Sequence, residues 1–154
     1  MKRNHTYFIL ILVTLMLNAC GKDVMEPYDH PFIHIMKDNL STTTVAWNVN
    51  AVNTYSVYLS SKPLKEKLTV DFDIIVGNGL QEGVDYEIIN KSRSLLFLPG
   101  IYDMPIRIKW LPNPIDPTKD NTIKIVLLSN SMNLTIGMPG PDHLQSEFTI
   151  TKTK

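Results

Sequence analysis

The chain has little cysteine, no long hydrophobic span and no excess of charge of one sign. Cys20 is the single cysteine among 154 residues, so no disulfide can join two parts of the chain. The apolar run over residues 8–17 is shorter than the ~20 residues that a membrane-spanning helix needs. Basic and acidic residues balance at 15 each. This balance leaves no basic surface of the kind that nucleic-acid-binding proteins carry.

Sequence motifs that identify common enzyme classes are also missing. The chain contains no Gly-x-Ser-x-Gly, the motif around the nucleophile of α/β-hydrolases. Gly77-Asn78-Gly79 precedes no helical pattern and lacks the lysine of a phosphate-binding loop. His30 and His34 have no cysteine, glutamate or further histidine at the spacing of zinc ligands. We therefore expect neither an enzyme nor a resident cofactor.

The first residues have the layout of an export signal rather than of a folded domain. A positively charged start precedes the apolar run, and a small residue precedes Cys20. Leu17-Asn18-Ala19-Cys20 resembles the lipobox of bacterial lipoproteins, in which the cysteine thiol receives a diacylglycerol and the signal is removed before it. The resemblance implies that residues 1–19 are a lipoprotein signal peptide and that Cys20 is lipidated. The alternative is an ordinary secretory peptide with a chance cysteine.

A lipidated cysteine implies a protein that is anchored to a membrane without crossing it. Stable attachment takes more than one acyl chain, at about 0.8 kcal/mol per buried methylene. The lipoprotein resemblance implies two or three such chains on Cys20, palmitate among them. Residues 20–31 combine charged residues with two prolines, a composition typical of an extended tether.

Two acidic residues of the predicted tether also indicate where the protein is located. Asp23 and Glu26 resemble the surface-export signal of Bacteroidetes-type lipoproteins. That resemblance implies an outer-membrane lipoprotein that faces the cell exterior. The alternative is that this stretch is a solvated linker and nothing more.

The remaining residues, 32–154, alternate between apolar and polar side chains with a period of two. Residues 68–76 and 106–110 show this alternation most clearly, and no amphipathic helical stretch exceeds a turn or two. Turn-forming residues such as Gly83 and Gly100 recur about every 8–12 residues. Half-buried strands without helices predict an all-β domain made of two packed antiparallel sheets, a sandwich or a barrel.

Short motifs in the second half of the chain give a family resemblance. They resemble a Calx-beta-type sandwich: Gly83-x-Asp85-Tyr86, Leu95-x-Phe97-x-Pro99-Gly100, Ile106-x-Ile108 and Ile123-x-Ile125-x-Leu127-x-Ser129. The closing Leu134-x-Ile136-Gly137-x-Pro139-Gly140-Pro141 resembles a related domain of unknown function, found in lipoproteins of Bacteroidetes-type glycan-utilisation systems. The resemblance covers Phe32 to about Lys152 and implies an immunoglobulin-like, Greek-key sandwich. Because the motifs consist of turn and core residues, they support the fold strongly and the function weakly.

The Calx-beta resemblance raises the question of calcium. Asp85, Asp116 and Asp120 occupy positions that match the family's acidic residues. Calcium takes six to eight oxygen ligands, several of them carboxylates. Residues 121–124 read Asn-Thr-Ile-Lys where the family has glutamates, so we do not favour a metal site. In the alternative reading Asp85 stabilises its turn, and the other two aspartates are solvated loop residues.

Aromatic side chains outside the core are candidate platforms for sugar rings, because the apolar face of a sugar stacks on an aromatic ring. Tyr58 falls on the polar side of its alternating segment, and Tyr102 lies in a turn. We therefore select these two tyrosines as candidate binding residues. Trp47 and Trp110 fall on apolar sides, and we expect them in or near the core. The alternative is that the tyrosines are ordinary surface residues.

Asp71 and Asp73 are candidates for hydrogen bonding to a bound sugar. They are two positions apart on one segment, which places them on the same side of a strand about 7 Å apart. Paired carboxylates can also hydrolyse glycosides. An open, solvated strand face offers no pocket for such a reaction, so we expect no catalytic role.

These observations together predict a non-catalytic outer-membrane lipoprotein. Its sandwich is expected to bind carbohydrate or a surface-protein partner, as an accessory to glycan capture. The alternative is a structural or assembly module without a ligand of its own.

Overall fold

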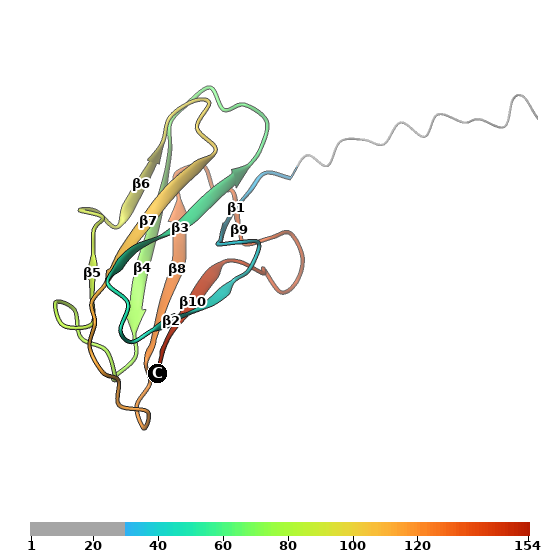
Figure 1. Ribbon diagram of the computed structural model, residues 1–154. Coiled ribbons are helices and arrows are strands. Elements are labelled where there is room, and N and C mark those ends of the chain that lie inside the picture. Colours follow the sequence, from blue (N-terminus) through green and yellow to red (C-terminus); the bar gives the residue numbers. More distant parts are fainter. Residues whose placement is uncertain (1–29) are drawn as a thin grey trace, which may run out of the picture.

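The computed structural model describes residues 30–154, and in that range it contains strands and no helix. Two five-stranded sheets pack face to face as a sandwich (Figure 1). The first sheet has the order β5 (Tyr86–Ile88), β7 (Asp103–Trp110), β3 (Ala51–Ser60), β1 (Phe32–Met36), β9 (Thr135–Ile136). The second has the order β2 (Thr42–Ala46), β10 (Glu147–Thr153), β8 (Thr122–Asn130), β4 (Leu68–Val76), β6 (Ser94–Phe97). The prediction of an all-β sandwich is confirmed.

Cys20, the predicted signal peptide and most of the predicted tether lie outside the described residues. Within residues 30–154 we find no helix with the length and apolar character needed to cross a membrane.

Alternate burial along the strands follows from their position between the core and solvent. On β7, Ile106, Ile108 and Trp110 are completely buried, whereas Arg107 is exposed. Phe72 on β4 has 1% of its surface exposed. The period of two in the sequence therefore indicates correctly which side of these strands faces the opposite sheet.

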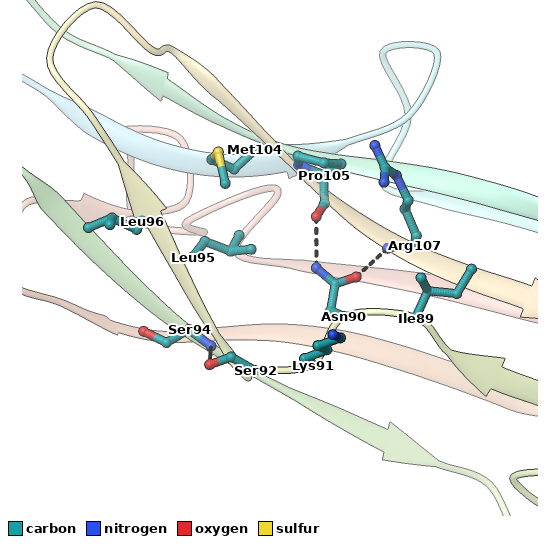
Figure 2. A pocket seen from close by; sticks show the side chains of 10 residues that line it. All are labelled: Ile89, Asn90, Lys91, Ser92, Ser94, Leu95, Leu96, Met104, Pro105 and Arg107. Carbon is teal, nitrogen blue, oxygen red and sulfur yellow. Dashed lines mark hydrogen bonds between the residues drawn. The ribbon is translucent and has the colours of Figure 1, made fainter.

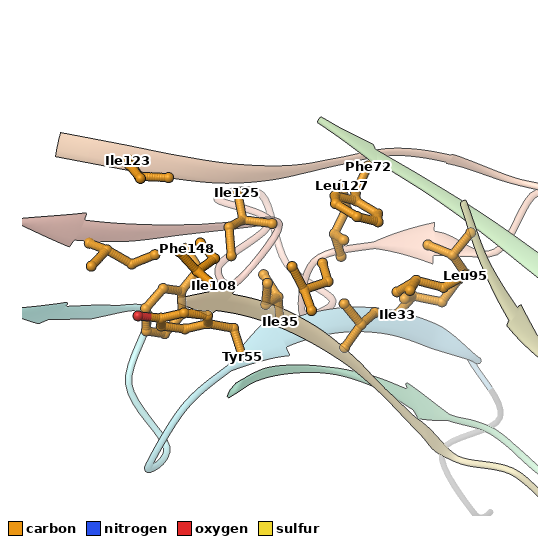
Figure 3. Packing of buried hydrophobic residues seen from close by; sticks show 14 of the residues in the cluster. Ile33, Ile35, Tyr55, Phe72, Leu95, Ile108, Ile123, Ile125, Leu127 and Phe148 are labelled. Atoms are coloured by element: carbon orange, nitrogen blue, oxygen red, sulfur yellow. The ribbon is translucent and has the colours of Figure 1, made fainter. Parts of the chain in front are cut away.

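The core lies between the two sheets and receives side chains from both. Ile33 and Ile35 of β1 face Ile125 and Leu127 of β8 across the sandwich, and Phe148 of β10 packs beside them (Figure 3). All five side chains are buried. Because the described residues include no disulfide, burial of apolar surface is the main source of stability for this domain.

Not every strand pair is antiparallel. β1 pairs with β9 in parallel, and so does β10 with β2. An alternating sequence pattern reports which face of a strand is buried but not the direction of its neighbour. The prediction of purely antiparallel sheets was therefore wrong at these two pairs.

The sandwich has two distinct ends. At the end where β1 begins, Phe32 lies opposite Ser60 of β3, and we call this the entry end. At the other end, Ala51 of β3 lies opposite Trp110 of β7, and we call this the far end. β3 runs from one to the other over 10 residues, which corresponds to about 30 Å.

Candidate functional site

The four residues proposed for sugar binding do not lie together. Tyr58 belongs to β3 in the first sheet, and Tyr102 lies in the loop before β7. Asp71 and Asp73 belong to β4 in the second sheet, and both point away from the core, as alternate burial on that strand shows. The tyrosines and the aspartates therefore cannot contact one small ligand at the same time.

Asp71 already has local hydrogen-bond partners. Ser129 Oγ donates to Asp71 Oδ2 over 2.9 Å. Hydrogen bonds from the Ser94 and Ser129 side chains hold the pKa of Asp71 below its usual value. Asp73 accepts a hydrogen bond from the backbone N–H of Ile74 at 2.8 Å. Both carboxylates thus stabilise the surface of β4.

Tyr58 is part of a row of three neighbouring aromatic rings on the outer face of the first sheet, in which it stacks on His34. Its ring lies 5.5 Å from that of His34, which in turn lies 5.2 Å from that of Phe32. His34 has 8% of its surface exposed, and burial lowers its pKa. The row forms because β1 and β3 pair with His34 opposite Tyr58. Sequence reasoning missed this contact because the register between the two strands is not visible in either strand alone.

Asp85, the first calcium candidate, is buried and bonded to a lysine. Lys152 Nζ lies 2.8 Å from Asp85 Oδ1 and also donates to the carbonyl of Leu111 at 3.0 Å. Asn113 Nδ2 donates to the same Asp85 oxygen at 3.0 Å, and the backbone N–H of Gln81 donates to the other at 2.9 Å. The position that a cation would need beside this carboxylate is filled by the lysine ammonium.

These contacts decide the protonation state of Asp85. Burial raises its pKa, but the hydrogen bonds from Lys152, Asn113 and Gln81 and the charge of Lys152 outweigh that effect. The pKa of Asp85 consequently lies below its usual value, and the carboxylate is ionised at neutral pH.

The other two calcium candidates stabilise the loop between β7 and β8. Asp116 accepts hydrogen bonds from the backbone N–H and the hydroxyl of Thr118, at 3.0 and 2.7 Å. Asp120 accepts the corresponding pair from Thr122, at 3.1 and 2.7 Å. Residues 30–154 contain no group of three histidine, cysteine, aspartate or glutamate side chains that could hold a metal ion.

The far end carries an apolar pocket that the sequence did not predict. Its volume is about 300 Å³. It is lined by Trp47, Pro114, Ile115, Pro117 and Lys154, and we call it the tryptophan pocket. Trp47 is only half-buried, which corrects the expectation that it lies on the core side of a strand. β2 ends at Ala46, so Trp47 falls in the following turn, where the alternation of the strand no longer applies.

Two backbone hydrogen bonds hold Trp47 in place. Its N–H donates to the carbonyl of Thr153 at the end of β10 over 2.7 Å, and its carbonyl accepts from Asn113 N–H at 3.0 Å. Asn113 also donates its side-chain amide to Asp85. The buried pair of Asp85 and Lys152 is therefore connected to the wall of the tryptophan pocket through a single asparagine.

The tryptophan pocket brings together segments that are far apart in the chain. Trp47 follows β2, the two prolines and Ile115 belong to the loop between β7 and β8, and Lys154 follows β10. In the sequence, a tryptophan beside a turn was the one signal that pointed to this pocket. Its partners could not be found without the order of the strands.

A second pocket lies between β6 and β7, and we call it the edge pocket (Figure 2). Its volume is about 320 Å³. Leu95, Leu96 and Met104 supply apolar lining, whereas Lys91 and Arg107 supply positive charge. No acidic residue lines it.

Comparison with known proteins supports the fold and does not extend to an activity or a ligand. No protein-family model matches the chain, and no curated protein matches it. Among solved structures, the crystal structure of CBD12 from CALX1.2 resembles it with a TM-score of 0.52 at 15% sequence identity. The match covers 79% of this chain and 45% of that chain. The fold is therefore Calx-beta-like, as the motifs predicted.

Proposed function

We propose that this protein is a non-catalytic binding module that is anchored to the outer membrane through lipid on Cys20 and binds carbohydrate in the tryptophan pocket. The observation that carries the proposal is the half-buried indole of Trp47 against an apolar pocket of about 300 Å³. Its role would be to hold a glycan at the cell surface for other proteins to use.

The chemistry of the pocket suits a sugar ring. Pockets for small molecules occupy about 300–1,000 Å³, so this one fits a single ring rather than a long chain. The indole offers a flat apolar face for stacking, and Lys154 in the lining offers a hydrogen-bond donor. Pro114 and Pro117 stiffen the loop that forms the opposite wall, which lowers the entropy cost of binding.

The position of the pocket suits a lipid-anchored protein. The chain enters the sandwich at β1, at the entry end, whereas Trp47 lies at the far end. The length of β3 separates the two ends by about 30 Å. A tether that leads from Cys20 to β1 would therefore present the tryptophan pocket on the side away from the membrane.

A glycan array probed with the Cys20→Ala chain tests carbohydrate binding. For a glycan that is retained, we expect Trp47→Ala to weaken affinity about 30-fold, the loss typical of an aromatic hot spot. Trp47→Phe, which keeps an aromatic ring, is expected to lose less. Tyr58→Ala and Tyr102→Ala serve as matched controls and should bind like the parent.

Intrinsic fluorescence gives an independent readout. Trp110 is completely buried, so a change in emission on adding glycan reports on Trp47. Unchanged affinity in a folded Trp47→Ala variant would contradict the assignment of the pocket. An array on which the folded protein retains nothing would favour the alternative of a structural module.

Mass spectrometry of the protein isolated from membranes tests the anchor. We expect Cys20 to be the first residue and to carry fatty-acyl groups, and Cys20→Ser to move the protein out of the membrane fraction. Digestion by protease added to intact cells tests exposure on the exterior. An unmodified Cys20, or full protection from protease, would contradict the corresponding part of the proposal.

A further inference from the structure

β6 forms an open edge of the second sheet, because β4 is its single partner. Phe72 N–H donates to the carbonyl of Arg93 at 2.9 Å. Hydrogen bonding alternates along antiparallel strands, so Leu95 and Phe97 also face β4 with their backbone groups. Leu96 consequently turns its N–H and C=O away from the sheet. These two groups are free to pair with another chain.

The sequence of β6 does not protect this edge. Natural proteins blunt open edges with lysine, proline or bulges. Residues 94–98 read Ser-Leu-Leu-Phe-Leu and contain neither charge nor proline. Leu96 and Leu98 are each 47% exposed. The edge therefore combines unpaired backbone groups with apolar side chains that another strand could cover.

The part of β7 that lines the edge pocket already has hydrogen-bond partners. Asn90 Nδ2 donates to the carbonyl of Pro105 at 3.0 Å, and the N–H of Arg107 donates to Asn90 Oδ1 at 2.7 Å (Figure 2). The amide of Asn90 thus binds β7 as a neighbouring strand would. An incoming strand at this side of the sandwich would have to pair with β6, next to the edge pocket.

Positive charge gathers around the same edge. Lys91 and Arg107 line the edge pocket, and Arg93 directly precedes β6. The salt bridges of residues 30–154 involve none of these three cations. Arg93 instead packs its guanidinium 5.7 Å from the centre of the Phe72 ring. The charge at this edge is available for a ligand that carries carboxylates.

We propose that an extended acidic segment of a partner protein adds to β6 as a further strand of the second sheet. Its backbone pairs with Leu96, its apolar side chains cover Leu96 and Leu98, and its carboxylates meet Lys91, Arg93 and Arg107. β6 has four residues, from Ser94 to Phe97, which give a contact of about 13 Å. The site is separate from the tryptophan pocket, so it stands whether or not that pocket binds carbohydrate.

Fluorescence anisotropy with a labelled, end-capped peptide of alternating valine and aspartate tests the proposal on the full chain in detergent. We expect this peptide to bind, and two relatives to bind at least about tenfold more weakly. One has lysine in place of aspartate. The other is N-methylated at alternate amides, which removes the donors needed for strand pairing.

Two protein variants locate the site. Leu96→Pro removes the outward N–H at an edge position that tolerates proline, and we expect affinity to fall about tenfold. Arg107→Glu reverses one charge and should weaken the acidic peptide while improving binding of the lysine peptide. Lys65→Glu makes the same charge change in the loop between β3 and β4, and it should leave both affinities within about twofold. Thermal unfolding checks that each variant is folded.

Several results would overturn the proposal. They are equal binding of the acidic and lysine peptides, full binding of the N-methylated peptide, and unchanged affinity in both folded variants at Leu96 and Arg107. A dimer that Leu96→Pro converts to a monomer would assign the edge to a second copy instead. Trp47→Ala should retain peptide binding, which separates this site from the proposed glycan site.

Discussion

Replacing Lys152 by methionine breaks the one buried ion pair that the structure describes. The side chains of Lys152 and Asp85 have 0% and 5% of their surface exposed. Methionine fills a similar volume but leaves the Asp85 carboxylate without its cation in a place that water hardly reaches. It also removes the donor that satisfies the Leu111 carbonyl at 3.0 Å.

The expected cost follows from that geometry. Breaking a buried pair by removing one partner costs about 3–5 kcal/mol, and the orphaned carbonyl places Lys152→Met in the upper half of that range. A domain of this size has a free energy of unfolding of about 5–15 kcal/mol. The variant should therefore lose a large part of its stability at neutral pH.

Urea denaturation followed by circular dichroism measures this loss. Asp85→Leu, and the double variant with both replacements, complete a double-mutant cycle. We expect the double variant to be more stable than the sum of the two single losses predicts, since it leaves no unpaired charge. A Lys152→Met protein as stable as the parent would refute the reasoning, because it would mean that Asp85 is well solvated without the lysine.

Three further predictions follow from the same structure. Phe72→Ala should cost about 3–5 kcal/mol by urea denaturation, because Phe72 fills the core, whereas Leu128→Ala, 58% exposed, should change little. Chelator should leave the melting temperature unchanged, since Lys152 fills the place of a cation at Asp85; a drop of several degrees would restore the calcium interpretation. Because the folded-state pKa of Asp85 is lowered, its contribution is complete above the unfolded pKa of about 3.9 and is lost as pH falls further. The difference in stability between parent and Asp85→Asn should therefore shrink below about pH 4, and a difference that is constant down to pH 2 would contradict this.

Much of the core could be predicted from the sequence because half-buried strands impose their alternation on it. Ile106, Ile108 and Trp110 are buried as expected. Lys152 shows the limit of that reasoning. It shares the inward side of β10 with Phe148 and Ile150, so the alternation itself places a lysine in the core. The signal was present, but the partner that makes such burial possible lies 67 residues away.

The candidate sites were less predictable because each depends on contacts between distant segments. The tryptophan pocket requires the turn after β2 and the loop after β7 to meet at one end of the sandwich. The open edge of β6 depends on the order of strands in the second sheet. Alternation determines which face of a strand is buried, whereas these features depend on which strand lies beside it.

The late position of Lys152 in the chain has a consequence for how the protein matures. Asp85 finds its cation only when the final strand arrives. A polypeptide whose synthesis has not yet reached Lys152 keeps this carboxylate in water and its sandwich incomplete. If synthesis stopped before β10, the product would lack the strand that carries Lys152 and its sandwich would stay open. Cellular proteases could distinguish such a product from the complete sandwich.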